Sequence, residues 1–296
     1  MKKSAGFYSQ LFKAMNHYLF CKQNNLNFNL DTTDWLFKYE YGWIDYFENI
    51  NINDNIETTN NIYVDHSNTF DNYPLYKYID IIPQIYKYNE KTKEKIHEKM
   101  NEYSLYNKSY DSIFIRRGDK LLEESKFISV EKYIDLLLLK NPKCTDLFIQ
   151  TDDYNCFIEI KEYIEKLKDV KINLYTLCPV TLKGVVVTKK SNDFLRNNNL
   201  PIHKNNYEYL IINKQKMLEN KSLYEMTKNE IYQHTIDMIV GIDIVLHSNI
   251  CITDFQSNVS RFIKLAHQKN TNVFCVNNPS NEVDLYNTTT PEKNWD

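Results

Sequence analysis

The segment SIFIRRGDK (residues 112–120) is the stretch of sequence that decides the fold class. Its first four residues form a short, mostly apolar run, and charged residues follow directly from Arg116 onward. The same order recurs at residues 147–153 and 250–258, and a pattern typical of a helix follows each of the three segments. Short apolar strands that alternate with helices are typical of a doubly wound parallel sheet. The sequence therefore predicts an α/β fold from about residue 110.

The spacing of apolar residues predicts the remaining elements. The part before residue 107 is expected to contain a helix over 7–22, an exposed polar loop over 51–72 and charged helices over 73–106. The later part is expected to contain strands at 112–115, 147–150, 250–253 and 272–275, and helices at 129–140, 154–168, 222–246 and 257–268. Residues 179–216 fit no element and are interpreted as an insertion. We therefore divide the chain into residues 1–107 and residues 108–296.

The composition excludes several classes of protein. The 296 residues are 42% hydrophobic and carry a net charge of −3, whereas a nucleic-acid-binding protein normally has a strongly basic face. No stretch approaches ~18 consecutive apolar residues, and the N-terminus lacks the continuous apolar segment of a signal peptide. We therefore expect a cytoplasmic protein with no membrane span and no nucleic-acid partner. The six cysteines are scattered singly, which indicates buried reduced thiols and no metal site.

Polar clusters follow three of the predicted strands, at the edge where parallel sheets bind their ligands. They are Arg116–Lys120, Thr151–Asp153 and Asp254–Asn258. A guanidinium group grips two phosphate oxygens at once and stabilises developing negative charge. Carboxylates recognise sugar hydroxyls or act as a base, and the amides at a helix N-terminus hold an anion. Because no Walker loop, Gly-x-Gly-x-x-Gly or Asp-x-Asp motif is present, the pattern points to metal-free handling of a nucleotide diphosphate by arginine.

Each cluster also has a purely structural interpretation. A charged run after a strand is usually a solvated turn. Asp152 and Asp153 are residue types that cap a helix, and Ser257 and Asn258 suit the first turn of the helix that follows them. The presence of three clusters at successive strand ends favours the functional interpretation.

The segment Phe114–Lys120 (FIRRGDK) resembles the His-x-Arg-Arg-x-Asp-Lys motif of the α1,6-fucosyltransferases. Glu124 falls where that family has a Glu implicated in acceptor activation, and Tyr133 falls on its Tyr nine positions further on. Thr151–Asp153 is similar to the family's Thr-Asp-Asp. Thr253–Arg261 is similar to its Thr-Phe-Ser-Ser-Gln-Val-Cys-Arg segment.

The N-terminal part is similar to the same family. Gly6–Leu11 resembles its Gly-Tyr-Gly-Cys-Gln-Leu turn into the first helix, although this chain has one glycine where the family has more. Trp35, Gly42–Trp43 and Phe47 resemble its Trp…Gly-Gly-Trp…Phe stretch. The resemblance therefore covers most of residues 5–270.

The resemblance implies a GT-B architecture, in which two Rossmann-type α/β domains face each other across a cleft. Residues 1–107 would form the acceptor side and residues 108–296 the nucleotide-sugar domain. The implied reaction is the inverting, metal-independent transfer of fucose from GDP-fucose to a hydroxyl of a glycan acceptor, without a cofactor. The implied catalytic residues are Arg116, Lys120 and Glu124, with Glu124 as the base. The implied donor-binding residues are Gly6, Arg116, Arg117, Asp119, Asp152, Asp153, Asp237, Ser257 and Asn258.

Departures from the family leave alternatives open. Phe114 stands where the family has a His that helps to recognise guanine. A family Asp that also reads guanine corresponds to Asp237 or Asp243. The spacing to Ser257 differs from that of the family for both, since Asp237 requires an insertion and Asp243 a deletion, and we slightly prefer Asp237. No counterpart of the family's membrane anchor, stem coil or SH3-like domain is seen, so the core of an N-glycan is not the expected acceptor. The alternatives are a transferase for another nucleotide sugar and a non-catalytic sugar- or nucleotide-binding protein of the same fold.

Overall fold

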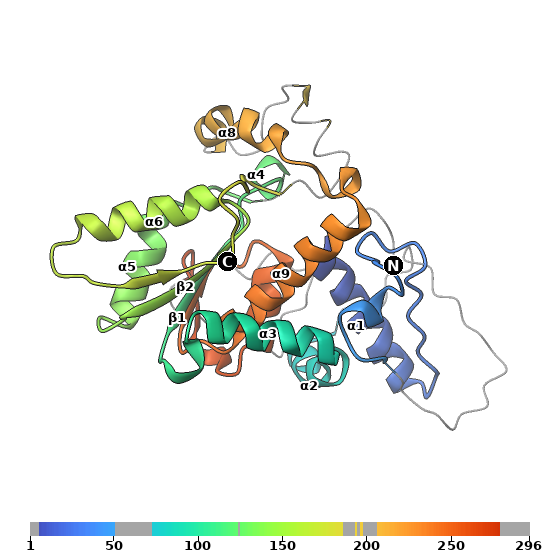
Figure 1. Cartoon of the computed structure of the whole chain (residues 1–296). Helices are drawn as coiled ribbons and strands as arrows, with labels where there is room; N and C mark the ends of the chain where they lie inside the picture. Colours follow the sequence, from blue (N-terminus) through green and yellow to red (C-terminus); the bar gives the residue numbers. More distant parts are fainter. Residues whose placement is uncertain are drawn as a thin grey trace.

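The computed structural model describes residues 6–50, 73–123, 125–185, 193, 196–197 and 206–278 (Figure 1). The protein is built on a five-stranded sheet in the order β3-β2-β1-β4-β5, and all four strand pairs are parallel. This confirms the predicted α/β fold with a parallel sheet. The polar loop predicted over 51–72 lies outside the described residues. The strands are β1 (Asp111–Ile115), β2 (Asp146–Thr151), β3 (Asn173–Tyr175), β4 (Cys251–Thr253) and β5 (Val273–Cys275).

Helices cover both faces of the sheet, because side chains alternate between the two faces along each strand. Ile113 and Ile115 of β1 pack with α5 and α6 on one face, whereas Phe114 packs on the opposite face with α9 and α10. The four predicted strands and the helices between them are confirmed with small shifts at their ends. The covering helices are α5 (Val130–Lys140), α6 (Tyr154–Lys166), α9 (Lys228–Leu246) and α10 (Asn258–Ala266).

Among the described elements, the sequence analysis missed one strand and one long helix, besides the four-residue helix α4 (Lys120–Glu123). The strand is β3, which has only three residues and lies at the edge of the sheet beside β2. The helix is α8 (Tyr207–Glu219), which overlaps the segment interpreted as an insertion. The helix predicted from residue 222 begins only at Lys228, because the hydroxyl of Thr227 accepts the backbone N–H of Glu230 and caps α9 there.

The regular structure of the N-terminal part, where the structure describes it, is helical, and residues 24–42 form turns and irregular segments. Its helices are α1 (Phe7–Gln23), α2 (Leu75–Ile85) and α3 (Glu90–Glu102), and its described residues contain no strand beyond an isolated bridge between Phe47 and Tyr88. These helices share one hydrophobic core with α9 and α10, and the ring of Tyr8 lies 4.8 Å from that of Phe262. The division of the chain at residue 107 into two domains remains a prediction.

Two further expectations concern membranes and thiols. In the ranges of the chain described above, no helix is both long and apolar enough to cross a bilayer.

All six cysteines are free and buried, which confirms the interpretation of reduced thiols. Burial raises the pKa of the Cys156 thiol to about 12.

Candidate functional site

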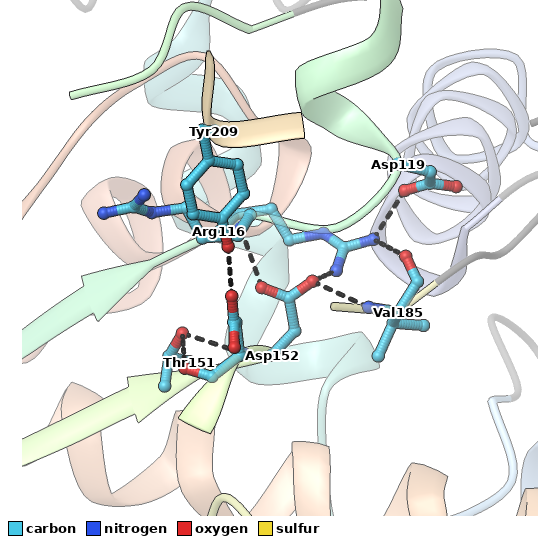
Figure 2. A network of polar contacts seen from close by, with 8 residues as sticks. Arg116, Asp119, Thr151, Asp152, Val185 and Tyr209 are labelled. Carbon is cyan, nitrogen blue, oxygen red and sulfur yellow. Dashed lines mark hydrogen bonds and ion pairs between the residues drawn. The ribbon is translucent and has the colours of Figure 1, made fainter. Parts of the chain in front are cut away.

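Arg116 is the first residue after β1, and its side chain joins two of the predicted polar clusters. Its Nη1 donates to the Asp152 carboxylate, which follows β2, and its Nη2 donates to Asp119 Oδ1 at 2.8 Å (Figure 2). Nη2 also lies 3.4 Å from the carbonyl oxygen of Val185. The side chain is only 12% exposed, so the charged run after β1 is not a solvated turn. The predicted neighbourhood of these two strand ends is therefore confirmed, and Arg116 is neutralised within it.

Asp152 locks the turns after β1 and β2 together. One of its oxygens accepts the backbone N–H of Arg117 at 2.7 Å, and the other accepts that of Val185 at 3.2 Å. Gly118 lies beneath this network with φ +42°, and a Cβ there would lie 2.5 Å from both Asp152 Oδ2 and the Val185 carbonyl oxygen. The close approach of Asp152 and Val185 therefore requires glycine at position 118.

Arg117 points away from the solvent. Its guanidinium lies over the rings of Phe127 and Tyr209, at 4.1 Å and 4.9 Å from their centroids, and donates to the Ile128 carbonyl at 3.2 Å. Its Nη2 lies 3.5 Å from Glu159 Oε2, and the side chain is 1% exposed. Burial raises the pKa of the Glu159 carboxyl, and the charge of Arg117 opposes that rise. These contacts hold β1 to α6 and α8, and donor binding by Arg117 stays a prediction.

Two of the predicted site residues cap helices. Asp153 is fully buried, accepts the backbone N–H of Asn155 at 3.0 Å as the cap of α6, and also accepts the hydroxyl of Tyr209. Ser257 is buried and accepts the backbone N–H of Ser260 at 3.1 Å as the cap of α10. The capping interpretation is thus confirmed for both residues. Asn258, the first residue of α10, is half-buried.

The cluster after β4 lies against the segments that follow β1. The Tyr133 hydroxyl donates to Asp254 Oδ2 at 3.0 Å, and Gln256 Oε1 accepts the backbone N–H of Lys126 at 2.7 Å. Burial raises the pKa of Tyr133, and the neighbouring charge of Asp254 raises it further. These contacts join the cluster after β4 to Lys126 and Tyr133, which follow the Arg116–Lys120 cluster along the chain.

Three predicted residues have less defined surroundings. Lys120 is half-buried and begins the short helix α4 (Lys120–Glu123). Glu124, the expected base, lies outside the described residues. Gly6 precedes α1, and a Cβ at that position would meet nothing within 4 Å, so its surroundings are open.

Both aspartates considered for reading the nucleotide base lie on α9. Asp237 lines a hollow of about 300 Å³ between α3 and α9, where its carboxylate accepts Gln233 Nε2 at 2.8 Å. Burial raises the pKa of Asp237. Asp243 is buried near the C-terminal end of α9, where its Oδ2 lies 3.2 Å from His247 Nδ1 and raises the pKa of His247 to about 9. Of the two, Asp237 is the one that lines this hollow.

The sequence analysis missed His234, which lies on α9 three residues before Asp237. Burial and, to a smaller extent, the positive charge of Arg116 lower the pKa of His234 to about 4, so this imidazole is neutral at pH 7. Residues three apart share a face of a helix, so the position of Asp237 was the signal that could have pointed to it. His234 thus adds an uncharged side chain to the surroundings of Arg116.

Neither the family models nor the curated proteins contain a match to this chain. In the described part of the molecule, no group of three or more His, Cys, Asp or Glu side chains could hold a metal ion. The geometry alone describes a buried arginine held by two carboxylates at the carboxyl edge of a parallel sheet. Its charge acts on the neutral His234 of α9, and Asp237 on the same helix lines a hollow.

Proposed function

We propose that the chain is a glycosyltransferase that moves a sugar from a nucleotide diphosphate to a glycan hydroxyl, with GDP-fucose as the expected donor. The observation that carries the proposal is the position of the Arg116 guanidinium at the carboxyl edge of β1, joined there to Asp152 from β2. Doubly wound sheets bind ligands at this edge, and arginine is the residue best suited to a diphosphate. The two-domain GT-B architecture, with the donor bound in residues 108–296, belongs to the same proposal.

Arg116 binds the diphosphate in this proposal by exchanging one carboxylate for phosphate. Its Nη1 stays on Asp152, which fixes the plane of the guanidinium, while the diphosphate replaces Asp119 on Nη2. Lys120, which directly follows Asp119, supplies a second positive charge as GDP departs.

The proposed chemistry is a single displacement with inversion. The acceptor oxygen forms a bond to the anomeric carbon of the sugar, the bond from that carbon to the diphosphate oxygen breaks, and GDP leaves. Glu124 takes the proton of the acceptor hydroxyl as general base, a role that rests on the resemblance to the α1,6-fucosyltransferases. Asp237 reads the nucleotide base from its hollow. Phe114 is buried in the core, so it replaces the family His without offering a polar group, which leaves donors with other bases as the alternative.

A second candidate function is a non-catalytic binding or scaffold protein of the same fold. The observation that favours it is the pairing of Arg116 with two carboxylates, since such a network also serves stability alone. The two candidates differ in one property, which is whether a nucleotide diphosphate binds at the carboxyl edge of the sheet.

A thermal-shift panel separates these functions. GDP, GDP-fucose, GDP-mannose, UDP-glucose and ADP are added with and without EDTA; a ligand at 100 times its Kd adds about 2.7 kcal/mol to stability. Stabilisation by GDP and GDP-fucose that ignores EDTA supports the fucosyltransferase, and a preference for UDP-glucose or ADP supports a different donor. No response to any of the five refutes donor binding and favours the scaffold. Asp237→Asn should weaken the response to GDP, whereas the exposed Asp169→Asn control should not.

A further inference from the structure

A second hollow, of about 200 Å³, lies in the N-terminal part of the molecule, away from the strand ends. It is lined by Asn29, Leu30, Thr32, Tyr41, Trp43, Ile44, Asn49 and Ile50. Tyr41 and Ile44 are exposed at its rim, and Tyr41 is 68% exposed. The side chains that give it its chemical character are Tyr41, Trp43, Ile44, Thr32, Asn29 and Asn49. None of the residues that line it is charged.

The loop that carries Tyr41 is held rigidly by one buried carboxylate. Asp45 accepts the backbone N–H groups of four successive residues, Tyr39 to Gly42, at 2.8–3.3 Å. Gly42 has φ +94°, and a Cβ there would collide with the side chain of Thr32. An exposed aromatic ring on a preorganised loop loses little conformational entropy when a ligand covers it.

The chemistry of this lining fits a neutral saccharide. The aromatic ring of Tyr41 and the side chain of Ile44 suit the apolar face of a pyranose ring, and the phenol adds a hydrogen-bonding group. The amides of Asn29 and Asn49 offer donors and acceptors to hydroxyl groups, and neither amide has a recorded hydrogen-bond partner among the described residues. A phosphate or carboxylate ligand would find no opposite charge among the lining residues.

The size of the hollow limits the ligand. A volume of about 200 Å³ is below the roughly 300–1,000 Å³ of pockets for drug-sized ligands. It corresponds to about seven water molecules at ~30 Å³ each. The volume of the hollow therefore suits a single sugar ring.

We propose that the hollow beside Tyr41 is a subsite for one neutral pyranose ring of a saccharide. Its loop packs against α9, because the ring of Tyr39 lies 4.6 Å from that of Tyr232, two residues before His234. The saccharide is the acceptor of the transfer reaction, an assignment that rests on the proposed function. The binding of the sugar ring itself does not rest on it.

Saturation-transfer NMR on the full chain tests this subsite. The probes are the methyl glycosides of glucose, galactose, mannose and N-acetylglucosamine, each measured with and without GDP. We expect at least one glycoside to receive saturation on its ring protons. Tyr41→Ala should weaken its affinity about tenfold, and Tyr41→Phe should keep most of it because the ring remains. Tyr106→Ala, which removes an exposed tyrosine outside the hollow, should change nothing.

The outcomes separate this proposal from the proposed function. The subsite is refuted if none of the four glycosides receives saturation, or if the saturation survives Tyr41→Ala. Either result refutes it even if GDP stabilises the protein. If saturation of a glycoside depends on Tyr41 but no nucleotide stabilises the protein, the subsite is supported and the transferase is refuted. If GDP abolishes the saturation of the glycoside, the sugar binds in the donor site, which would also refute the subsite. Asn49→Ala provides a second readout, because removal of its amide should weaken binding without affecting the Tyr41 loop.

Discussion

Replacement of Arg116 by alanine is expected to weaken folding as well as any donor binding. The guanidinium is 12% exposed and compensates two carboxylates, of which Asp119 is 8% exposed and Asp152 12% exposed. Arg116→Ala leaves both carboxylates close together without their counterion. Removal of one partner of a buried ion pair costs roughly 3–5 kcal/mol. Because this network retains some solvent contact, we expect a loss of about 3 kcal/mol, near the lower limit.

Urea unfolding, followed by tryptophan fluorescence at pH 7, measures this loss directly. For a chain of this size, about 3 kcal/mol corresponds to a decrease in Tm of roughly 6–12 °C. Lys95→Ala is the matched control, because Lys95 forms an exposed ion pair with Glu98, and its loss should leave the urea midpoint unchanged. A midpoint for Arg116→Ala equal to that of the control would refute the reasoning that Arg116 is held within a buried network.

Three further predictions follow from the same structure. Gly118→Ala should lower the free energy of unfolding, measured by urea titration, by roughly 2–4 kcal/mol. The new Cβ would collide with Asp152, and the backbone at this position has a positive φ. An unchanged urea midpoint would contradict the close packing. The ion pair with Asp243 raises the pKa of His247 from 6.5 to about 9. This ion pair therefore stabilises the folded protein fully below pH 6.5, and the stabilisation is lost as the pH rises through 9. Urea titrations between pH 6 and 9.5 should show this decrease, and His247→Gln should remove it; equal slopes in both proteins would argue against the ion pair. Asp45→Ala should speed hydrogen exchange of the amides of residues 39–42, which lose their common acceptor, and unaltered exchange there would show that the loop is held by other contacts.

Much of the sheet was predictable because its strands are buried on both faces. The apolar runs that became β1, β2, β4 and β5 are short and end in charged or polar residues, so their positions are visible in the sequence. β3 was missed because three residues at the edge of a sheet, partly exposed, give almost no periodic signal. The alternation of Ile172 and Leu174 was the only indication of it.

The strand-end clusters were predictable as neighbours but their internal pairing was not. Parallel strands bring their carboxyl ends to one edge, and Arg116 and Asp152 do meet there. The partner that the sequence could not supply is Val185, whose carbonyl and N–H bind Arg116 and Asp152 from a segment without any recognised motif. Such long-range backbone contacts depend on tertiary packing, and they turn an arginine that appeared available to a ligand into one already neutralised.

The measurement that tests the central claim most directly is calorimetric titration of GDP-fucose into the wild-type protein and into Arg116→Lys. Lysine keeps the positive charge but loses the planar fork that grips two oxygens, so the variant isolates diphosphate recognition from charge. The account predicts saturable binding to the wild-type protein, competition by GDP and an affinity for the variant that is at least about tenfold weaker, or 1.4 kcal/mol. Equal affinity in both proteins, or no binding to the wild-type protein, would contradict the claim that the carboxyl edge of β1 is a donor site.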